Sequence, residues 1–126
     1  MKKQLITICI VATLFACSTQ TERKNIPQEE VKTTFAVDDP DYEPGLALVE
    51  KSDCLSCHKV NEVSVGPSYV AIAERYEKTP QNISLLADKI VKGGQGVWGQ
   101  VPMLAHPALA NEDAEKMVKY ILLLKP

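Results

Sequence analysis

The chain has 126 residues, of which 45% are hydrophobic and 24% are charged, and its formal net charge is −2. This length accommodates one domain and excludes a multidomain enzyme. The small net charge, without any dense run of lysine or arginine, excludes the usual nucleic-acid-binding surface. With only 2 Phe and 1 Trp, the chain has few large side chains from which to build a core, so we expect a bound group to complete it.

The N-terminus has the pattern of an export signal. Two lysines precede an apolar run over residues 5–16, which is too short to span a bilayer but is typical of a signal peptide. The run ends in Leu-Phe-Ala-Cys17, which resembles the bacterial lipobox, whose Cys is lipidated and becomes the mature N-terminus. An ordinary secretory signal cleaved nearby and an uncut anchor are the alternatives. We predict a signal peptide over residues 1–16, cleavage before Cys17 and lipidation of Cys17.

The residues after the signal differ from those of a folded domain. Residues 17–40 are polar and charged, contain Pro27 and Pro40, and show no sustained apolar period. Such a segment is expected to be a flexible tether with a root-mean-square reach of about 25 Å. The sequence therefore predicts a lipid-anchored, exported protein facing the periplasm or the cell exterior, with a folded domain over residues 41–126.

The cysteine pattern of the domain indicates a covalently bound haem. Of the 4 Cys, Cys9 lies in the signal and Cys17 is the expected lipid site, which leaves Cys54 and Cys57. They stand in Cys-Leu-Ser-Cys-His, which is the attachment pattern of c-type haem. Two cysteines at this spacing can each form a thioether with one haem vinyl group, and His58 can bind the iron. We therefore predict one haem c with its iron.

Other uses of this cysteine pair fit the sequence less well. A structural zinc site needs four ligands, and His106 is the one usual ligand left beyond the Cys-Leu-Ser-Cys-His motif. A thioredoxin-like redox pair requires a βαβ context, for which the chain lacks β-branched strand runs. A disulfide between Cys54 and Cys57 would be strained and would close almost no loop.

The sixth iron ligand decides between electron transfer and chemistry at the iron. Met103 follows a stretch with four glycines and Pro102, which predicts a tightly shaped loop, and its thioether suits low-spin iron. Met103 could instead fill a gap in the core. Met117 lies in a helical apolar pattern and is expected in the core. His106 would give a bis-histidine haem of lower potential, but we expect it to be a loop histidine near the haem edge.

Apolar periodicity and capping signals predict an all-α domain. The expected helices cover residues 43–52, 68–76, a third segment that starts at Thr79-Pro80 or Asn82 and ends near 92, and a last segment from Asn111 to about 124. The third is expected to stop at Gly93.

These residues together resemble the small bacterial class I cytochromes c of the c551/c552 type. The resemblance rests on residues 54–58, 66–69, 92–99 and 101–103 and on the final helix, and it covers residues 41–126. It implies the cytochrome c fold, with about four short helices around one covalently bound haem c. It also implies that the first and last helices cross beside the haem, where Leu48 or Val49 would meet Tyr120.

The resemblance implies roles for two further residues of the site. The Pro67 carbonyl would accept a hydrogen bond from Nδ1 of His58, and Trp98 would donate its Nε1–H toward a haem propionate. The chain departs from the family after Met103, where it reads Leu-Ala-His-Pro instead of a second proline followed by an asparagine near the sulfur.

With His58 and Met103 on the iron, no position remains open for peroxide or dioxygen. The sequence thus predicts a one-electron carrier, not an enzyme, that takes an electron from one redox protein and gives it to another, without a small-molecule substrate. Lys59, Lys89 and Lys92 are candidates for the edge of the docking face. The alternatives are an electron-entry subunit of a larger dehydrogenase or oxidase, and a haem peroxidase or sensor with a displaceable sixth ligand.

Overall fold

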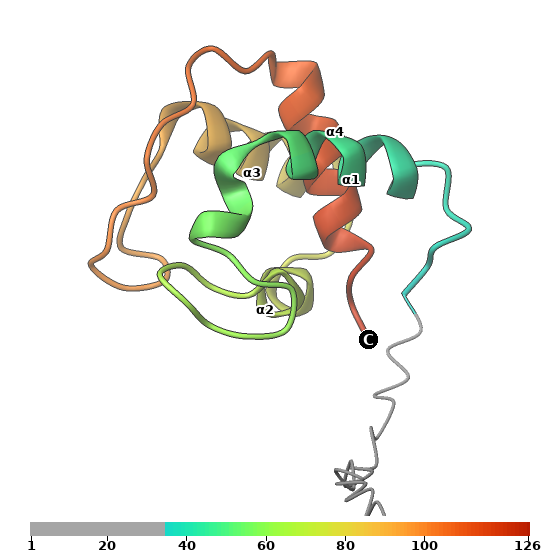
Figure 1. Cartoon of the computed structure of the whole chain (residues 1–126), viewed down its shortest axis with the longest axis horizontal. Helices are drawn as coiled ribbons and strands as arrows, with labels where there is room; N and C mark the ends of the chain where they lie inside the picture. The colour runs from blue at the N-terminus through green and yellow to red at the C-terminus, as the bar shows by residue number, and fades with distance from the viewer. Residues whose placement is uncertain (1–34) are drawn as a thin grey trace, which may run out of the picture. The chain divides into compact units, whose positions relative to one another are not determined.

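The computed structural model describes residues 35–126, which form a helical domain (Figure 1). Its elements in chain order are α1 (Tyr42–Lys51), the 3₁₀-helix η1 (Asp53–Ser56), α2 (Tyr69–Arg75), α3 (Pro80–Lys92) and α4 (Asn111–Leu122). Within the described range the one β-type pairing is an isolated bridge between Gly94 and Met103. The all-α prediction is confirmed. The predicted signal peptide, Cys17 and most of the predicted tether lie outside the described residues.

The helix ends follow from local hydrogen bonding. The Ser68 hydroxyl accepts a hydrogen bond from the Ala71 amide at 3.1 Å at the start of α2, and the Thr79 hydroxyl accepts one from the Asn82 amide at 3.2 Å at the start of α3. Thr79, not Asn82, therefore caps the third helix, and Gly93 ends it as expected. The last helix ends at Leu122, two residues before the predicted end. The short η1 was not predicted.

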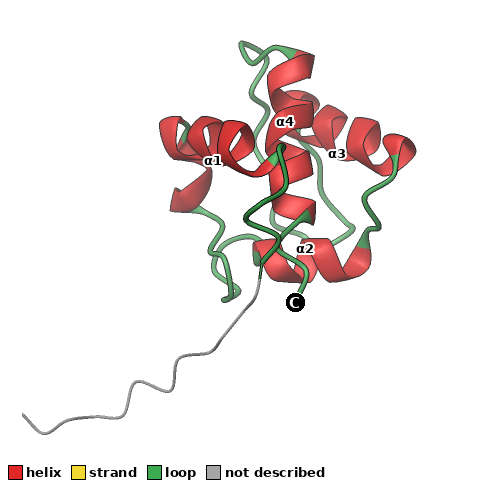
Figure 2. Cartoon of the chain, turned by 90° about the vertical axis from the view of Figure 1, so that its right-hand side faces the viewer, coloured by secondary structure: helices red, strands yellow, loops and turns green. Residues whose placement is uncertain are grey.

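The core forms around α4, which lies between α1 and α3, with α2 near its C-terminal end (Figure 2). The most deeply buried large side chains are Val49, Tyr69, Met117, Val118 and Leu124. Met117 is 1% exposed, so the prediction that it belongs to the core is confirmed. None of the helices in residues 35–126 is long and apolar enough to cross a membrane.

Helices α1 and α4 approach each other at Gly45. A Cβ atom at this position would overlap the Cβ of Tyr120 and the carbonyl oxygen of Lys116, so only glycine fits without a backbone shift. The Tyr42 and Tyr120 rings meet edge to face beside it, with centroids 5.1 Å apart. Burial, with Tyr42 and Glu50 nearby, raises the pKa of Tyr120 to about 12. Val49 and Tyr120 both belong to the buried cluster, but the residues that the structure places directly against Tyr120 are Gly45 and Tyr42, which the sequence reasoning missed.

The segment before α1 is fixed to the rest of the domain. Phe35 packs against the core cluster. The Lys78 ammonium lies 3.2 Å from a carboxylate oxygen of Asp39 and 3.0 Å from one of Asp41, and Lys119 reaches Asp41 at 3.4 Å. The hydrogen bond from Lys78 is the main cause that lowers the pKa of Asp41. These contacts join residues 35–41 to the segment between α2 and α3 and to α4.

Candidate haem site

The Cys-Leu-Ser-Cys-His segment forms a tight turn directly after α1. The Cys54 carbonyl accepts hydrogen bonds from the amides of Cys57 at 3.2 Å and His58 at 2.9 Å. The side chains of these three residues therefore extend from one short, tightly turned stretch of backbone. The two cysteines are not joined in a disulfide, and both are partly buried. Burial raises the pKa of the Cys54 thiol. The arrangement offers two sulfurs for thioether formation and keeps the histidine beside them.

A hydrogen bond to the backbone of Pro67 orients the His58 ring. Its Nδ1 lies 2.7 Å from the carbonyl oxygen of Pro67. Because a carbonyl only accepts, Nδ1 carries the proton and the lone pair lies on Nε2, the atom that is then free to bind a metal. The Gly66 amide donates to the Cys57 carbonyl at 2.9 Å, which keeps the Pro67 segment against the turn.

Two neighbours restrict the plane of the His58 ring. A Cβ atom at Gly66 would lie 2.6 Å from His58 Cε1, so the absence of a side chain lets the backbone pass directly beside the ring. The Tyr69 ring also stacks on the His58 ring, with the two ring centroids 5.6 Å apart and an angle of 18° between the ring planes. The sequence reasoning gave Tyr69 no role, although its place two residues after Pro67 in a chain with few aromatic side chains was a signal.

The Tyr69 hydroxyl is a buried polar atom without a hydrogen-bond partner among the described residues. The residue is 2% exposed, and burial, with the Cys54 thiol nearby, raises the pKa of Tyr69. Buried polar atoms are normally paired, so this one marks a place where the described chain alone does not complete the structure. Its neighbour Cys54 is one of the two haem-attachment residues.

Met103 is held by the base of a folded loop. The Met103 amide donates to the Gly94 carbonyl at 2.8 Å, and the Gly94 amide donates to the Met103 carbonyl at 3.2 Å. The loop tip closes through Gly96 and Gly99 at 2.8 Å, and both have positive φ. Met103 and Cys54 pack against the same core cluster. Nε2 of His106, three residues after Met103, lies 3.1 Å from Oδ1 of Asp53, the residue before Cys54, so the Met103 loop and the haem-attachment turn meet there.

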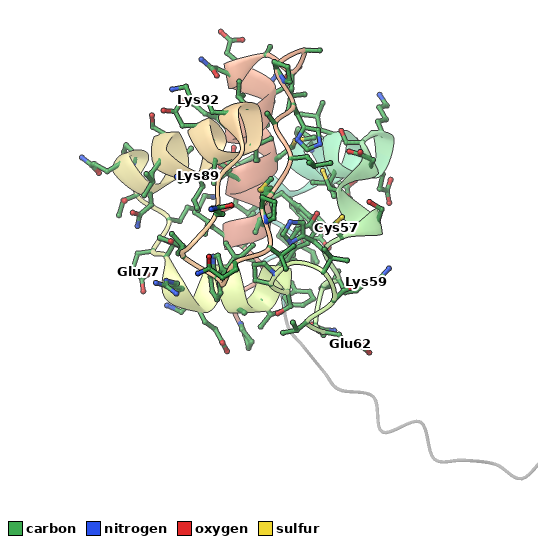
Figure 3. The ribbon with its side chains drawn as sticks, turned by 90° about the vertical axis from the view of Figure 1, so that its left-hand side faces the viewer. Cys57, Lys59, Glu62, Glu77, Lys89 and Lys92 are labelled. Carbon is green, nitrogen blue, oxygen red and sulfur yellow. The ribbon has the colours of Figure 1, made fainter. Side chains whose placement is uncertain are left out.

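Figure 3 faces the loop between α3 and α4, with Cys57 and Lys59 to one side of it and Lys89 and Lys92 on α3 to the other. Trp98 in this loop is 44% exposed. The Arg75 guanidinium lies 4.7 Å from the centroid of the Trp98 indole and donates to the Val97 carbonyl at 3.4 Å. Arg75 therefore fixes the tryptophan on the side of α2.

Exposed apolar side chains gather in the haem-attachment turn and the segment after it, and in the glycine-rich loop that carries Met103. Nine large apolar side chains of residues 35–126 are exposed, and seven of them come from 55–65 and 97–104: Leu55, Val63, Val65, Val97, Trp98, Val101 and Leu104. Apolar surface of this extent marks a binding site. A flat apolar macrocycle attached at Cys54 and Cys57 would cover part of this surface and leave an apolar edge. The residues present therefore fit a haem.

The helical fold and the single Cys-Leu-Ser-Cys-His turn define a c-type haem protein with one haem. The sequence profile of the family described as cytochrome c matches residues 42–125, and the chain belongs to that family. Cys54 and Cys57 hold haem c covalently, and the family consists of electron-transfer proteins rather than enzymes. These conclusions confirm the predicted fold and cofactor and the prediction that the protein is not an enzyme.

The chain is similar to bacterial cytochromes of the c551/c552 type. Cytochrome c-552 of Nitrosomonas europaea is 38% identical over 78 residues, covering 62% of this chain and 76% of that protein. Cytochrome c-551 of Allochromatium vinosum is 38% identical over 77 residues, covering 61% and 82%. The crystal structure of the wild-type Nitrosomonas europaea protein superposes with a TM-score of 0.59 and covers 64% of this chain and 99% of that one.

Substitution of Gly66 by alanine is expected to disturb the His58 ring. The added Cβ would lie 2.6 Å from the ring, so either the ring or the backbone has to move. We expect a loss of about 1–3 kcal/mol in the free energy of unfolding of the haem-loaded protein, measured by denaturant titration. Leu85→Ala on α3 is the control, because Leu85 is 48% exposed and lies outside segments 55–65 and 97–104. Equal stability of Gly66→Ala and wild type would show that the ring is not confined there.

Proposed function

We propose that this cytochrome c carries single electrons between extracytoplasmic redox proteins, with its iron held by His58 and Met103. Haem c, when bound, supplies an iron that alternates between Fe(III) and Fe(II). The observation that carries the proposal is the His58 ring, whose Nδ1 donates to Pro67 at 2.7 Å and leaves Nε2 free for the metal. Two protein ligands leave no iron position for a substrate, which suits electron relay.

The hydrogen bonds around Met103 support its role as the second ligand. Its backbone is paired with Gly94 in both directions, so its position is set by the end of α3. The other two candidates are engaged elsewhere. Met117 is 1% exposed in the core, and the two ring nitrogens of His106 face Ile90 and Asp53. A thioether ligand favours Fe(II) and raises the potential.

Trp98 is the residue we propose for a haem propionate. Its indole Nε1–H can only donate, so it suits a carboxylate. Its ring is half-exposed in the glycine-rich loop and is held from one side by Arg75 at 4.7 Å. The guanidinium places a positive charge beside the same loop, which favours a negatively charged group there. Pro67 acts on the other side of the site by keeping His58 in one tautomer.

The apolar edge of the site is the proposed docking surface for the redox partners. We use this name for Val63, Val65, Val101 and Leu104, which are 57% to 78% exposed. Lys59 and Glu62 lie on the turn after the haem-attachment residues, and Lys89 and Lys92 lie on α3 (Figure 3). An apolar centre with charged residues at its border fits the small, short-lived interfaces of electron-transfer proteins.

We further propose that the protein is exported and held at a membrane through a lipid on Cys17. The support is the signal-like run over residues 5–16 and the lipobox-like sequence that ends it. Residues 17–34 then link the anchor to the described domain. Several acyl chains on one residue give stable anchoring, since each buried CH₂ contributes about 0.8 kcal/mol. The anchor would keep the carrier close to membrane-bound redox partners.

Replacement of Met103 by histidine tests the proposed ligation through the reduction potential. A second imidazole stabilises Fe(III) relative to Fe(II), so the midpoint potential is expected to fall by on the order of 0.1 V or more in a redox titration. Met117→Leu is the matched control, because it removes the other methionine thioether of residues 35–126 while keeping the core volume. A potential that changes with Met117 and not with Met103 would overturn the ligand choice.

Replacement of Cys17 by serine tests the anchor separately. The wild-type protein is expected in the membrane fraction, with a mature N-terminus at Cys17 whose mass carries acyl chains. Cys17→Ser cannot be acylated there, so the variant is expected to leave the membrane fraction after cleavage elsewhere, or to remain attached by its uncut signal with an unmodified mass. Cys9→Ser is the control for a cysteine inside the signal. An unmodified Cys17 in the mature wild-type protein would exclude the lipid.

A further inference from the structure

His106 lies three residues after Met103, in the segment that leads from the glycine-rich loop to α4. Its backbone amide donates to the carbonyls of Ile90 at 3.1 Å and Val91 at 3.2 Å, both in the last turn of α3. Its own carbonyl accepts from the Leu109 amide at 3.0 Å. The backbone of His106 is therefore fixed against the same helix end that holds Met103 through Gly94.

The side chain of His106 connects this segment to the haem-attachment turn. Its Nε2 lies 3.1 Å from Oδ1 of Asp53, and its Nδ1 lies 3.3 Å from the carbonyl oxygen of Ile90. Asp53 begins η1 and directly precedes Cys54. One imidazole thus joins the end of α3, the segment after Met103 and the residue beside the first haem thioether, although Asp53 and His106 are 53 positions apart.

The two partners of the ring decide which form of His106 makes both contacts. A backbone carbonyl and a carboxylate can only accept hydrogen bonds, and a neutral imidazole has one N–H to donate. Only the protonated ring donates to both.

The other charged side chains on the adjoining elements do not replace this contact. Lys92, in the last turn of α3, pairs with Asp88 at 2.8 Å on the same helix. The Lys89 ammonium folds over Gly94, where a Cβ atom would lie 3.2 Å from it. On the other side, Glu50 and Lys51 end α1 before the turn that begins at Asp53. Among these groups, the Asp53 carboxylate is the one that bonds to His106.

We propose that His106 is a positioning residue that, when protonated, fastens the Met103 segment to the haem-attachment turn and so resists displacement of Met103 from the iron. The inference rests on the proposed ligation by Met103. His106 does not bind the iron in this arrangement, because both ring nitrogens serve the contacts to Ile90 and Asp53. The neutral ring has a single N–H, so loss of the second proton removes one of the two hydrogen bonds.

The experiment uses the haem-loaded oxidised protein and imidazole as a competing ligand, with its concentration counted as the unprotonated form. Displacement of Met103 is read from the Fe(III)–methionine charge-transfer band at constant ionic strength. In wild type, the half-saturating imidazole concentration is expected to fall about two- to fivefold from pH 5.5 to pH 8.5, as expected for a partly exposed ion pair. His106→Ala is expected to show the low value at both pH values.

Three further variants separate positioning from a general charge effect. His106→Gln keeps one donor but cannot titrate, so its value should lie between wild type and His106→Ala and stay constant with pH. Asp53→Asn should remove most of the pH dependence. The double variant Asp53→Asn/His106→Ala should have nearly the same half-saturating imidazole concentration as His106→Ala alone. Asp88→Asn is the matched control, because it removes the same charge from a pair within one helix and should keep the wild-type profile.

Distinct results would overturn this inference and the proposed function. Equal imidazole sensitivity in wild type and His106→Ala, fully additive effects of Asp53→Asn and His106→Ala, or a profile in Asp88→Asn that matches Asp53→Asn would each reject the positioning role while leaving Met103 on the iron. Absence of the charge-transfer band from wild type at every pH would instead reject Met103 as the ligand, which is the failure of the proposed function.

Discussion

The hydrogen bond from His58 Nδ1 to the Pro67 carbonyl is the contact on which the haem site depends. It fixes the tautomer of the ring and directs the remaining nitrogen away from the protein backbone. Gly66 lets the backbone pass beside the ring, and Tyr69 stacks against it, so the plane of the imidazole is confined as well. An imidazole held this firmly would change its geometry little between two oxidation states of a bound metal, which favours fast electron transfer.

The helices supply a frame that positions both this turn and the methionine loop. Gly45 allows α1 to cross α4 closely, and the haem-attachment turn begins directly after α1. The loop that carries Met103 starts from Gly93 at the end of α3, which packs on the other side of α4. The Met103 segment then reaches back to Asp53 through His106. Both proposed ligands therefore depend on helices that contact the same central helix.

The parts of the structure that sequence reasoning could predict are those encoded locally. The Cys54–His58 spacing indicates the cofactor, glycine and proline around Met103 indicate a shaped loop, and Thr79 and Gly93 mark the two ends of α3. The missed features involve residues distant in the chain. Gly45 matters because of Tyr120, Tyr69 because of His58, and His106 because of Asp53. Each contact requires the tertiary fold, which the periodicity of one segment does not contain.

The most direct test of the central claim is the absorption spectrum of the oxidised, haem-loaded protein, followed by exposure of the reduced protein to carbon monoxide, in wild type and in Met103→Ala. If His58 and Met103 hold the iron, wild type has the Fe(III)–methionine charge-transfer band and does not bind carbon monoxide, and the variant lacks the band and binds it. A wild-type protein without the band that binds carbon monoxide readily would contradict the account, because its iron would have an open position.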